Sequence, residues 1–347
     1  MKHLISFLLL LPIVLLIGCD KPASEYKRSL FVFGTLVDIS IVDASLNESD
    51  MAVKAIDEQF QKMHTHWHAW KPGGELATFN SKIAKGETVE VSDFLLPLII
   101  QSVLLSEQSE HLFNPAIGEL INLWGFHSDE LPEGPPPGKD TIQNYLITQP
   151  FMSDLKINGH LIRATNAHVQ LDLGGFAKGY ALNEATRILQ EEGVRNAIVN
   201  AGGDLCVIGE KGNRPWRIGI RHPQGEGVIA SVEARDGECV LTSGNYERYR
   251  VYEGKRYPHI LDPGTGMPVN HIASVTVIDR DGGRADAAAT ALTIAGPEHW
   301  YRIARKMQLE YVMLVDAQGN IYMNPAMQRR LHLETGQSGT LIVSAPL

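Results

Sequence analysis

The alternation of apolar and polar positions along this 347-residue chain predicts both strands and helices. Residues 30–45 alternate apolar and polar side chains, which is typical of strands that bury one face. Residues 49–70 instead carry apolar side chains at helical spacing, among them Ile56, Phe60 and Met63. The period therefore changes from that of strands to that of a helix early in the chain.

Later segments repeat both patterns. HVQLDL, residues 168–173, predicts a strand, and residues 176–193 predict a helix that ends at Gly193, a favoured C-terminal residue. Such separate strands and helices favour an α+β fold: one large mixed domain, with an antiparallel-rich sheet and packed helices. The other predicted strands are 196–204, a short strand that runs into a glycine turn, and 216–223, 231–237, 238–244 and 273–280. The other predicted helices are 92–110 (capped by Ser92), 285–296 and 297–307.

The N-terminus has the pattern of a secretory signal. Lys2 precedes a long apolar stretch, which ends in Leu-Ile-Gly-Cys at residues 16–19. That ending resembles a bacterial lipobox, in which the cysteine, here Cys19, is lipidated. A plain transmembrane anchor is the alternative, because the stretch is long enough to span a bilayer. Asp20 implies retention at the inner membrane, so we expect a lipid-anchored protein on its periplasmic face.

Charge and composition limit the expected partners and the domain organisation. The chain has 31 basic and 40 acidic residues and a net charge of −9, without a basic tract, so nucleic acid is not an expected partner. Cys206 and Cys239 could pair in an oxidising compartment or remain free. The proline-rich residues 131–140 predict a surface loop. We expect a signal peptide at 1–18, a tether at 19–29 and the domain at 30–347.

LDLGGFAKGY, residues 171–180, is the first candidate for chemistry. A P-loop would need Ser or Thr after its Gly-Lys pair, and a dinucleotide fingerprint would need another glycine spacing, so neither motif is present. A predicted strand, Gly174, Gly175 and then a helix start could still bind an anion, helped by Lys178. A tight turn with a solvated lysine explains the same residues, and both interpretations remain open.

Two other segments could contribute to the same chemistry. Asp286 and Thr290 are four residues apart and share one face of a predicted helix, where two hard oxygen ligands suit Mg²⁺. Thr290 could equally bond back to its own helix. His259 stands between a predicted strand and the turn sequence DPGTG, where it could accept a proton or be structural.

An aromatic segment, HTHWHAW at residues 64–70, invites a metal interpretation. Only His64 and His68 have the spacing to share one zinc ion on a helix. Trp70 fits better as an aromatic edge that stacks on a flat ring, and the alternative is a core tryptophan. Asn114 stands in an Asn-Pro turn.

In chain order, several motifs together resemble the ApbE-type FAD:protein FMN transferases. They are WKPGGELATFN, FNPAIGELINLWGF, LDLGGFAKGYALNEA, NAGGD, LTSGNYERY, YPHILDPGTGMPV and ADAAATAL, and the resemblance covers about residues 30 to 315. It implies a Mg²⁺-dependent reaction in which FAD is split at its pyrophosphate. FMN is then joined through a phosphoester to Ser or Thr of a target flavoprotein subunit, such as those of membrane redox complexes, and AMP leaves.

The resemblance also implies roles for single residues. Asp286, Thr290 and the Gly175 carbonyl would bind magnesium, and His259 would activate the acceptor hydroxyl. Phe33 stands where the family often has Met, and Asn114 where Asp is common. An FAD pyrophosphatase and a flavin-carrying lipoprotein are the alternative functions. The implied FAD contacts are Phe33, Trp70, Leu112, Phe113, Asn114, Asp172, Lys178, His259 and Ile260.

Overall fold

The computed structural model describes residues 25–128, 130–335 and 339–347. The predicted signal peptide, residues 1–18, and Cys19 lie outside this range. Within the described residues, no helix is both long enough and apolar enough to cross a membrane.

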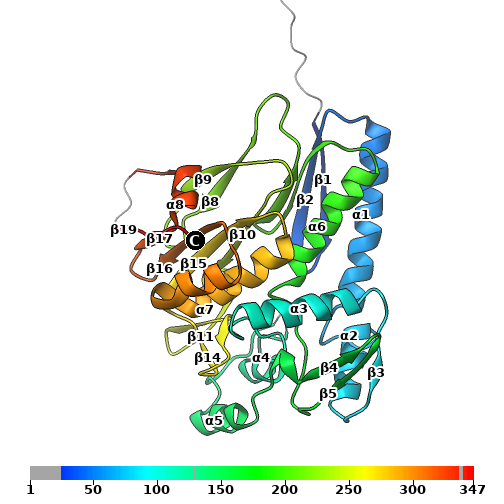
Figure 1. The fold of residues 1–347 in the computed structure, drawn as a ribbon, viewed down its shortest axis with the longest axis vertical. Coiled ribbons are helices and arrows are strands. Elements are labelled where there is room, and N and C mark those ends of the chain that lie inside the picture. The colour runs from blue at the N-terminus through cyan, green and yellow to red at the C-terminus, as the bar shows by residue number, and fades with distance from the viewer. Residues whose placement is uncertain (1–24, 129, 336–338) are drawn as a thin grey trace, which may run out of the picture.

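One nine-stranded sheet forms the centre of the molecule (Figure 1). All neighbouring strands in it are antiparallel except β17 and β19, which run parallel. The predicted α+β class with an antiparallel-rich sheet is therefore confirmed. In spatial order the strands are β1 (Glu25–Val32), β2 (Thr35–Val42), β6 (Asn196–Ala201), β7 (Asp204–Ile208), β10 (Cys239–Gly244), β15 (Ile272–Asp279), β16 (Tyr311–Asp316), β17 (Ile321–Met323) and β19 (Leu341–Val343).

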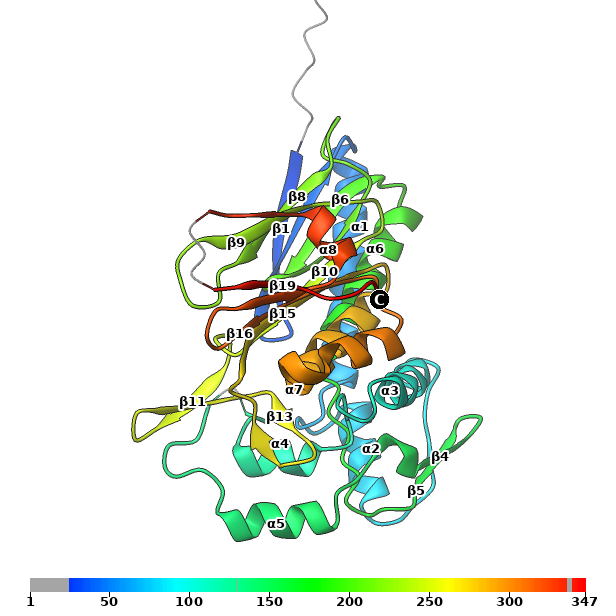
Figure 2. The same cartoon turned by 60° about the vertical axis from the view of Figure 1, so that its left-hand side comes forward.

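The sheet is covered on both faces. Three helices pack on one face, α1 (Leu46–His66), α6 (Ala177–Glu191) and α7 (Gly282–Lys306), and Figure 2 shows the layering from the side. A second sheet covers the other face, with β8 (Trp216–Arg221) and β18 (Leu331–Leu333) on either side of β9 (Val228–Ala234).

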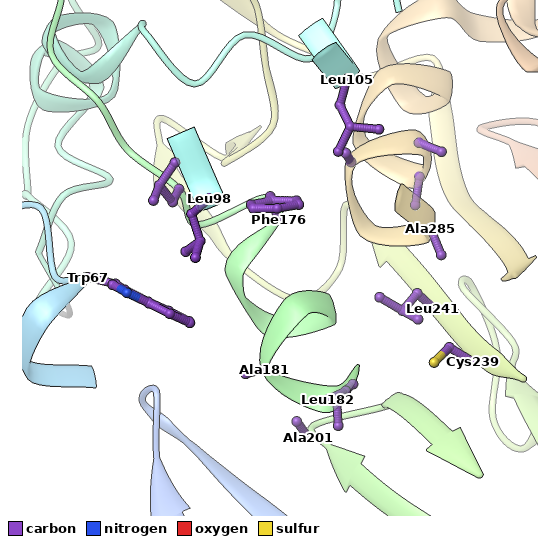
Figure 3. Packing of buried hydrophobic residues seen from close by; sticks show 14 of the residues in the cluster. Trp67, Leu98, Leu105, Phe176, Ala181, Leu182, Ala201, Cys239, Leu241 and Ala285 are labelled. Atoms are coloured by element: carbon purple, nitrogen blue, oxygen red, sulfur yellow. The ribbon is translucent and has the colours of Figure 1, made fainter. Parts of the chain in front are cut away.

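Strand β7 is buried on both faces because it lies inside this sandwich. Leu205 and Val207 belong to the core beneath the second sheet, whereas Cys206 belongs to the core beneath the helices. Figure 3 shows Cys239 and Leu241 of β10 on that helical side, near Ala285 of α7. Cys206 and Cys239 form a disulfide, which settles the pairing that the sequence left open.

The short helix α8 (Pro325–Arg330) contacts β16, whereas the other elements gather below α7 in Figures 1 and 2 and form the lower region. Residues 131–138 of the proline-rich stretch form a loop between α4 (Gly118–Trp124) and α5 (Lys139–Ile147), as predicted, and its last two residues begin α5. The lower region comprises α2 (Glu75–Ile83), α3 (Leu96–Gln108), α4 (Gly118–Trp124), α5 (Lys139–Ile147), a small sheet of β3 (Val89–Glu90), β5 (Leu161–Ala164) and β4 (Leu155–Asn158), and the hairpins β11 (Tyr249–Tyr252) with β12 (Lys255–Pro258) and β13 (Leu261–Asp262) with β14 (Met267–Pro268).

Three sequence predictions need correction. Residues 25–29 belong to β1 rather than to the tether, because the β1–β2 ladder pairs backbone groups whatever the side chains are. The helix predicted from residue 92 begins at Leu96, since Ser92 opens a preceding turn and its hydroxyl accepts the Phe94 N–H. Residues 168–173 form no ladder beyond one isolated bridge at Gln170.

Two helix predictions hold. α6 occupies the predicted span, and Gly193 follows it with a φ of 84°, the left-handed conformation that favours glycine. Helices 285–296 and 297–307 are the two arms of α7, which bends where Gly296 leaves helical geometry before Pro297.

Candidate active site

The turn that begins at Leu171 is held in place by side chains instead of a sheet. The Asn80 amide donates to the Leu171 carbonyl and accepts its N–H, both at 2.8 Å. Asp172 then accepts two hydrogen bonds, from the Gly174 N–H at 2.8 Å and from Trp70 Nε1 at 2.7 Å. Trp70 and Asp172, 102 positions apart in the chain, therefore meet in one half-buried pair.

The three predicted metal ligands converge where α6 meets α7. A Cβ built on Gly175 would lie only 3.1 Å from Thr290 Oγ1, so the glycine turn lies directly against that hydroxyl. The Gly179 N–H donates to Asp286 Oδ2 at 3.0 Å. A Cβ on Gly179 would come within 2.0 Å of the Gly282 carbonyl oxygen, so only glycine permits this approach of the two helices.

The start of α6 therefore differs from the open anion site that the sequence suggested. Its first-turn Gly179 N–H is already bonded to a carboxylate of the protein itself. Asp286 is 5% exposed, and Thr290 is half-buried. One carboxylate, one hydroxyl and the neighbouring glycine backbone form an oxygen-rich corner of the kind that Mg²⁺ prefers.

Lys178 is bound to a carboxylate that sequence reasoning missed. Its ammonium forms an ion pair with Asp204, the first residue of β7, whose other oxygen accepts the Thr242 N–H at 3.0 Å. The sequence did carry a signal for Asp204, because NAGGD ends in this residue after two glycines. Lys178 is therefore fixed by β7 and is not a solvated lysine.

The charges around Lys178 shift one another's pKa values. Burial, reinforced by Asp204, raises the pKa of Asp286 to about 7. Burial likewise raises the pKa of Glu247 to about 7, although Lys178 opposes this shift. For Lys178 the burial effect is outweighed by Asp204, Asp286 and Glu247, which together hold its pKa above the usual value. Carboxylates outnumber cations at this corner, so an added cation would stabilise their ionised forms.

His259 has a defined tautomer. Its Nδ1 lies 3.0 Å from the Arg248 carbonyl oxygen, which can only accept, so Nδ1 carries the proton and Nε2 is the acceptor nitrogen. Burial lowers the pKa of His259 to about 4; the hydrogen bond to the Arg248 carbonyl opposes this shift, and the positive charges of Arg248 and Lys178 add to it. The ring is therefore neutral at pH 7.

The other predicted FAD contacts fall into two groups. Leu112 packs with buried Ile260 in one small cluster. Phe113 lies 6.3 Å, ring centre to ring centre, from Phe176 at the start of α6. By contrast, both ends of the Asn114 amide are engaged, with the Pro150 carbonyl and the Ala116 N–H, so this side chain holds the turn.

Phe33 lies at the β1–β2 turn with a φ of 56° and packs on Phe60 at 5.3 Å between ring centres. It also meets His64 of the aromatic segment. Helix α1 ends at His66, so His64 and His68 do not share one helical face. No group of three or more His, Cys, Asp or Glu side chains that could hold a metal occurs within residues 25–128, 130–335 and 339–347.

Comparisons with known proteins point to one family. The model of the ApbE family matches residues 33–313. An FAD:protein FMN transferase from Rhodobacter capsulatus is 41% identical over 91% of this chain, which spans 60% of that relative's length. An FAD:protein FMN transferase from Vibrio cholerae is 29% identical, and the match spans 91% of that relative's length.

Solved structures similar to this chain belong to the same family. The ApbE protein from Thermotoga maritima superposes with a TM-score of 0.78 at 31% identity, covering 86% of this chain and 96% of that one. Flavin transferase ApbE from Vibrio cholerae gives 0.79 at 26% identity, covering 89% and 100%.

Proposed function

Because the chain belongs to the ApbE family, we propose that it is a Mg²⁺-dependent FAD:protein FMN transferase. It cleaves the pyrophosphate of FAD, joins FMN by a phosphoester to a Ser or Thr of a target flavoprotein, and releases AMP. The observation that carries the proposal is the convergence of Gly175, Asp286 and Thr290 at one corner, with Lys178 three residues further on in the first turn of α6.

FAD binding is assigned to two groups of residues: those that would contact the flavin ring and the cation that would contact the pyrophosphate. Trp70, oriented by its bond to Asp172, offers a face for the flat flavin ring. Leu112 and Ile260 offer an apolar contact. Lys178 places its ammonium near the pyrophosphate, where a fixed cation favours the charge that develops during transfer.

The magnesium ligands are Asp286, Thr290 and the Gly175 carbonyl, all hard oxygen donors. A bound Mg²⁺ would supply Lewis-acid stabilisation of the pyrophosphate oxygens. Burial and Asp204 raise the pKa of the Asp286 carboxyl to about 7. A bound cation would therefore stabilise the ionised form of this carboxyl.

His259 acts as the general base. Its Nε2 accepts the proton of the acceptor hydroxyl, and that oxygen forms a bond to the phosphorus on the FMN side of the pyrophosphate. The P–O bond to AMP breaks, and AMP leaves with the electron pair. The Arg248 carbonyl holds the proton on Nδ1 and so keeps Nε2 in the accepting form.

The test combines the purified protein, FAD, MgCl₂ and a candidate flavoprotein subunit. We expect a fluorescent flavin band that survives denaturing electrophoresis, FMN on a threonine or serine by mass spectrometry, and AMP in equal amount. Free FMN that accumulates without a modified protein would indicate an FAD pyrophosphatase instead. FAD binding without AMP under any condition would indicate a carrier protein.

Lipidation of Cys19, placement on the periplasmic face of the inner membrane and target subunits in membrane redox complexes are parts of the same proposal. Their support is the sequence Leu-Ile-Gly-Cys at residues 16–19 and Asp20 after it. Full-length protein should fractionate with inner membranes, and Cys19→Ala should prevent acylation as measured by mass spectrometry of the N-terminal peptide.

A further inference from the structure

The Cys206–Cys239 disulfide joins two strands whose backbone pairing is very short. The β7–β10 ladder consists of the pairs Cys206–Cys239 and Leu205–Val240 alone, whereas β10 pairs with β15 along all six of its residues. Two backbone hydrogen bonds, from the Val207 N–H to the Glu238 carbonyl at 2.9 Å and from the Gly237 N–H to the Val207 carbonyl at 3.0 Å, continue this contact beyond the ladder. The covalent bond reinforces a backbone pairing that remains short.

The residue that orients Lys178 lies at the end of this same strand pair. Asp204 precedes Cys206 by two positions, and it bonds both the Thr242 N–H of β10 and the Lys178 ammonium. It is 4% exposed, so its carboxylate depends on these partners. The disulfide and the Asp204–Thr242 bond therefore brace the strand pair together.

The disulfide also contacts α6, which packs against α7, the helix that carries Asp286 and Thr290. Asn183 of α6 lies with its Nδ2 3.9 Å from Cys239 Sγ, and its Oδ1 accepts the Gly282 N–H at 2.6 Å at the start of α7. Gly179 and Asp286 meet at this same α6–α7 junction. Asn183 therefore places the Cys239 sulfur beside the junction of α6, the helix that carries Lys178, with α7.

We propose that the Cys206–Cys239 disulfide, acting through Asp204, is a positioning device that fixes the Lys178 ammonium against FAD. The inference rests on the proposed function, which gives Lys178 its ligand. Asp204 and the two cysteines touch neither FAD nor the acceptor and are positioning residues. Without the covalent bond the strands β7 and β10 separate more freely, Asp204 loses its fixed place, and the lysine samples positions away from the pyrophosphate.

The experiment measures kcat and KM for FAD, and the dissociation constant of FAD by flavin fluorescence, in three proteins. These are the wild type, the double variant Cys206→Ala/Cys239→Ala and Asp204→Asn, which keeps the disulfide. We expect kcat/KM to fall on the order of 10-fold in the double variant, because a displacement of about 1 Å can cost up to about 100-fold. Combining all three substitutions should add little to Asp204→Asn alone, because both act through one lysine.

Val312→Ala is the matched control, because Val312 is fully buried in β16 of the same sheet and is remote from β7. It should lower the melting temperature without changing kcat/KM. A folded double variant with wild-type kcat/KM and FAD affinity would overturn the inference, as would effects that simply add in the triple variant. If the double variant does not fold, Asp204→Asn with unchanged kcat/KM and FAD affinity overturns it.

The proposed function can be refuted independently of this inference. A wild-type protein that binds FAD but transfers no FMN would refute the transferase, while the FAD dissociation constants of the same variants would still decide whether the disulfide positions Lys178.

Discussion

The two sides of the proposed FAD site are built in different ways. At the corner, Asp286 and Thr290 stand on α7, and Lys178 stands on α6 against the braced strand β7, while Gly175 lies in the turn before α6. The opposite side, with Trp70, Leu112 and His259, stands on loops of the lower region, held by hydrogen bonds such as Trp70–Asp172 and His259–Arg248.

This difference fits the roles that the proposed function gives to the two sides. Charge stabilisation during phosphoryl transfer depends steeply on distance, so its groups belong on elements that cannot shift. Flavin stacking tolerates small displacements, and an acceptor protein has to reach the histidine, so loops suit that side. Substitutions at the corner should therefore change the rate most, and substitutions on the loops should mainly change affinity.

Asp286→Ala should have the largest effect. It removes the only carboxylate among the three proposed magnesium ligands, and we expect FMN transfer to fall by about 10³-fold or more, equivalent to about 4 kcal/mol. Transfer to the acceptor is measured by in-gel flavin fluorescence across a MgCl₂ titration. Asp281→Asn is the matched control, because this N-cap of α7 also carries a carboxylate and Asn preserves capping. Wild-type rates in Asp286→Ala would remove the metal assignment.

Loss of the disulfide should cost the next largest free energy. The bond closes a loop of 33 positions, and the Cys206→Ala/Cys239→Ala variant should lose about 3 kcal/mol of unfolding free energy. Urea unfolding followed by tryptophan fluorescence measures it. We expect a smaller loss of unfolding free energy in the lower region, because single hydrogen bonds hold its loops. Asn114→Ala, which frees the Pro150 carbonyl, should cost only about 1 to 2 kcal/mol of unfolding free energy. A larger loss for Asn114→Ala would reverse this order.

The regular elements of the corner were predictable from the sequence because their periodicity is strong. Helices α6 and α7 were placed correctly, and the i, i+4 spacing of Asp286 and Thr290 put both on one helical face. The ion pair of Lys178 with Asp204 was not predictable. It joins residues on α6 and β7, and only the tertiary fold determines that distance.

Prediction was weaker where side chains replace backbone pairing. Residues 168–173 have the composition of a strand, yet Asn80 bonds Leu171 in place of a neighbouring strand. No local pattern reports a partner 91 positions away. For the same reason, the tautomer of His259 depends on a carbonyl that the sequence cannot position.

The pH dependence of the unfolding free energy should reveal the lowered pKa of His259. Its folded pKa, about 4, lies below the ordinary value of 6.5, so the unfolded chain binds more protons between these pH values. The neutral ring therefore contributes stability that is complete above pH 6.5 and is lost as pH falls toward 4. Allowing for the partial exposure of the ring, we expect about 2 kcal/mol. The difference in unfolding free energy between wild type and His259→Gln, measured from pH 4 to 7.5, should shrink by this amount at low pH, and a constant difference would contradict the assignment.

The smallest effect is expected at Trp70. Trp70→Phe keeps an aromatic face for the flavin but removes the Nε1–H donor to Asp172, so the ring loses its orientation and not its stacking surface. We expect the FAD dissociation constant to rise about 5-fold, equivalent to about 1 kcal/mol, with kcat nearly unchanged. Asp172→Ala should weaken binding to a similar degree, and the double variant should add little, because both substitutions break one bond. A fall in kcat as large as that of Asp286→Ala would show that the loop side also positions the reacting phosphorus, and the division between the two sides would then be wrong.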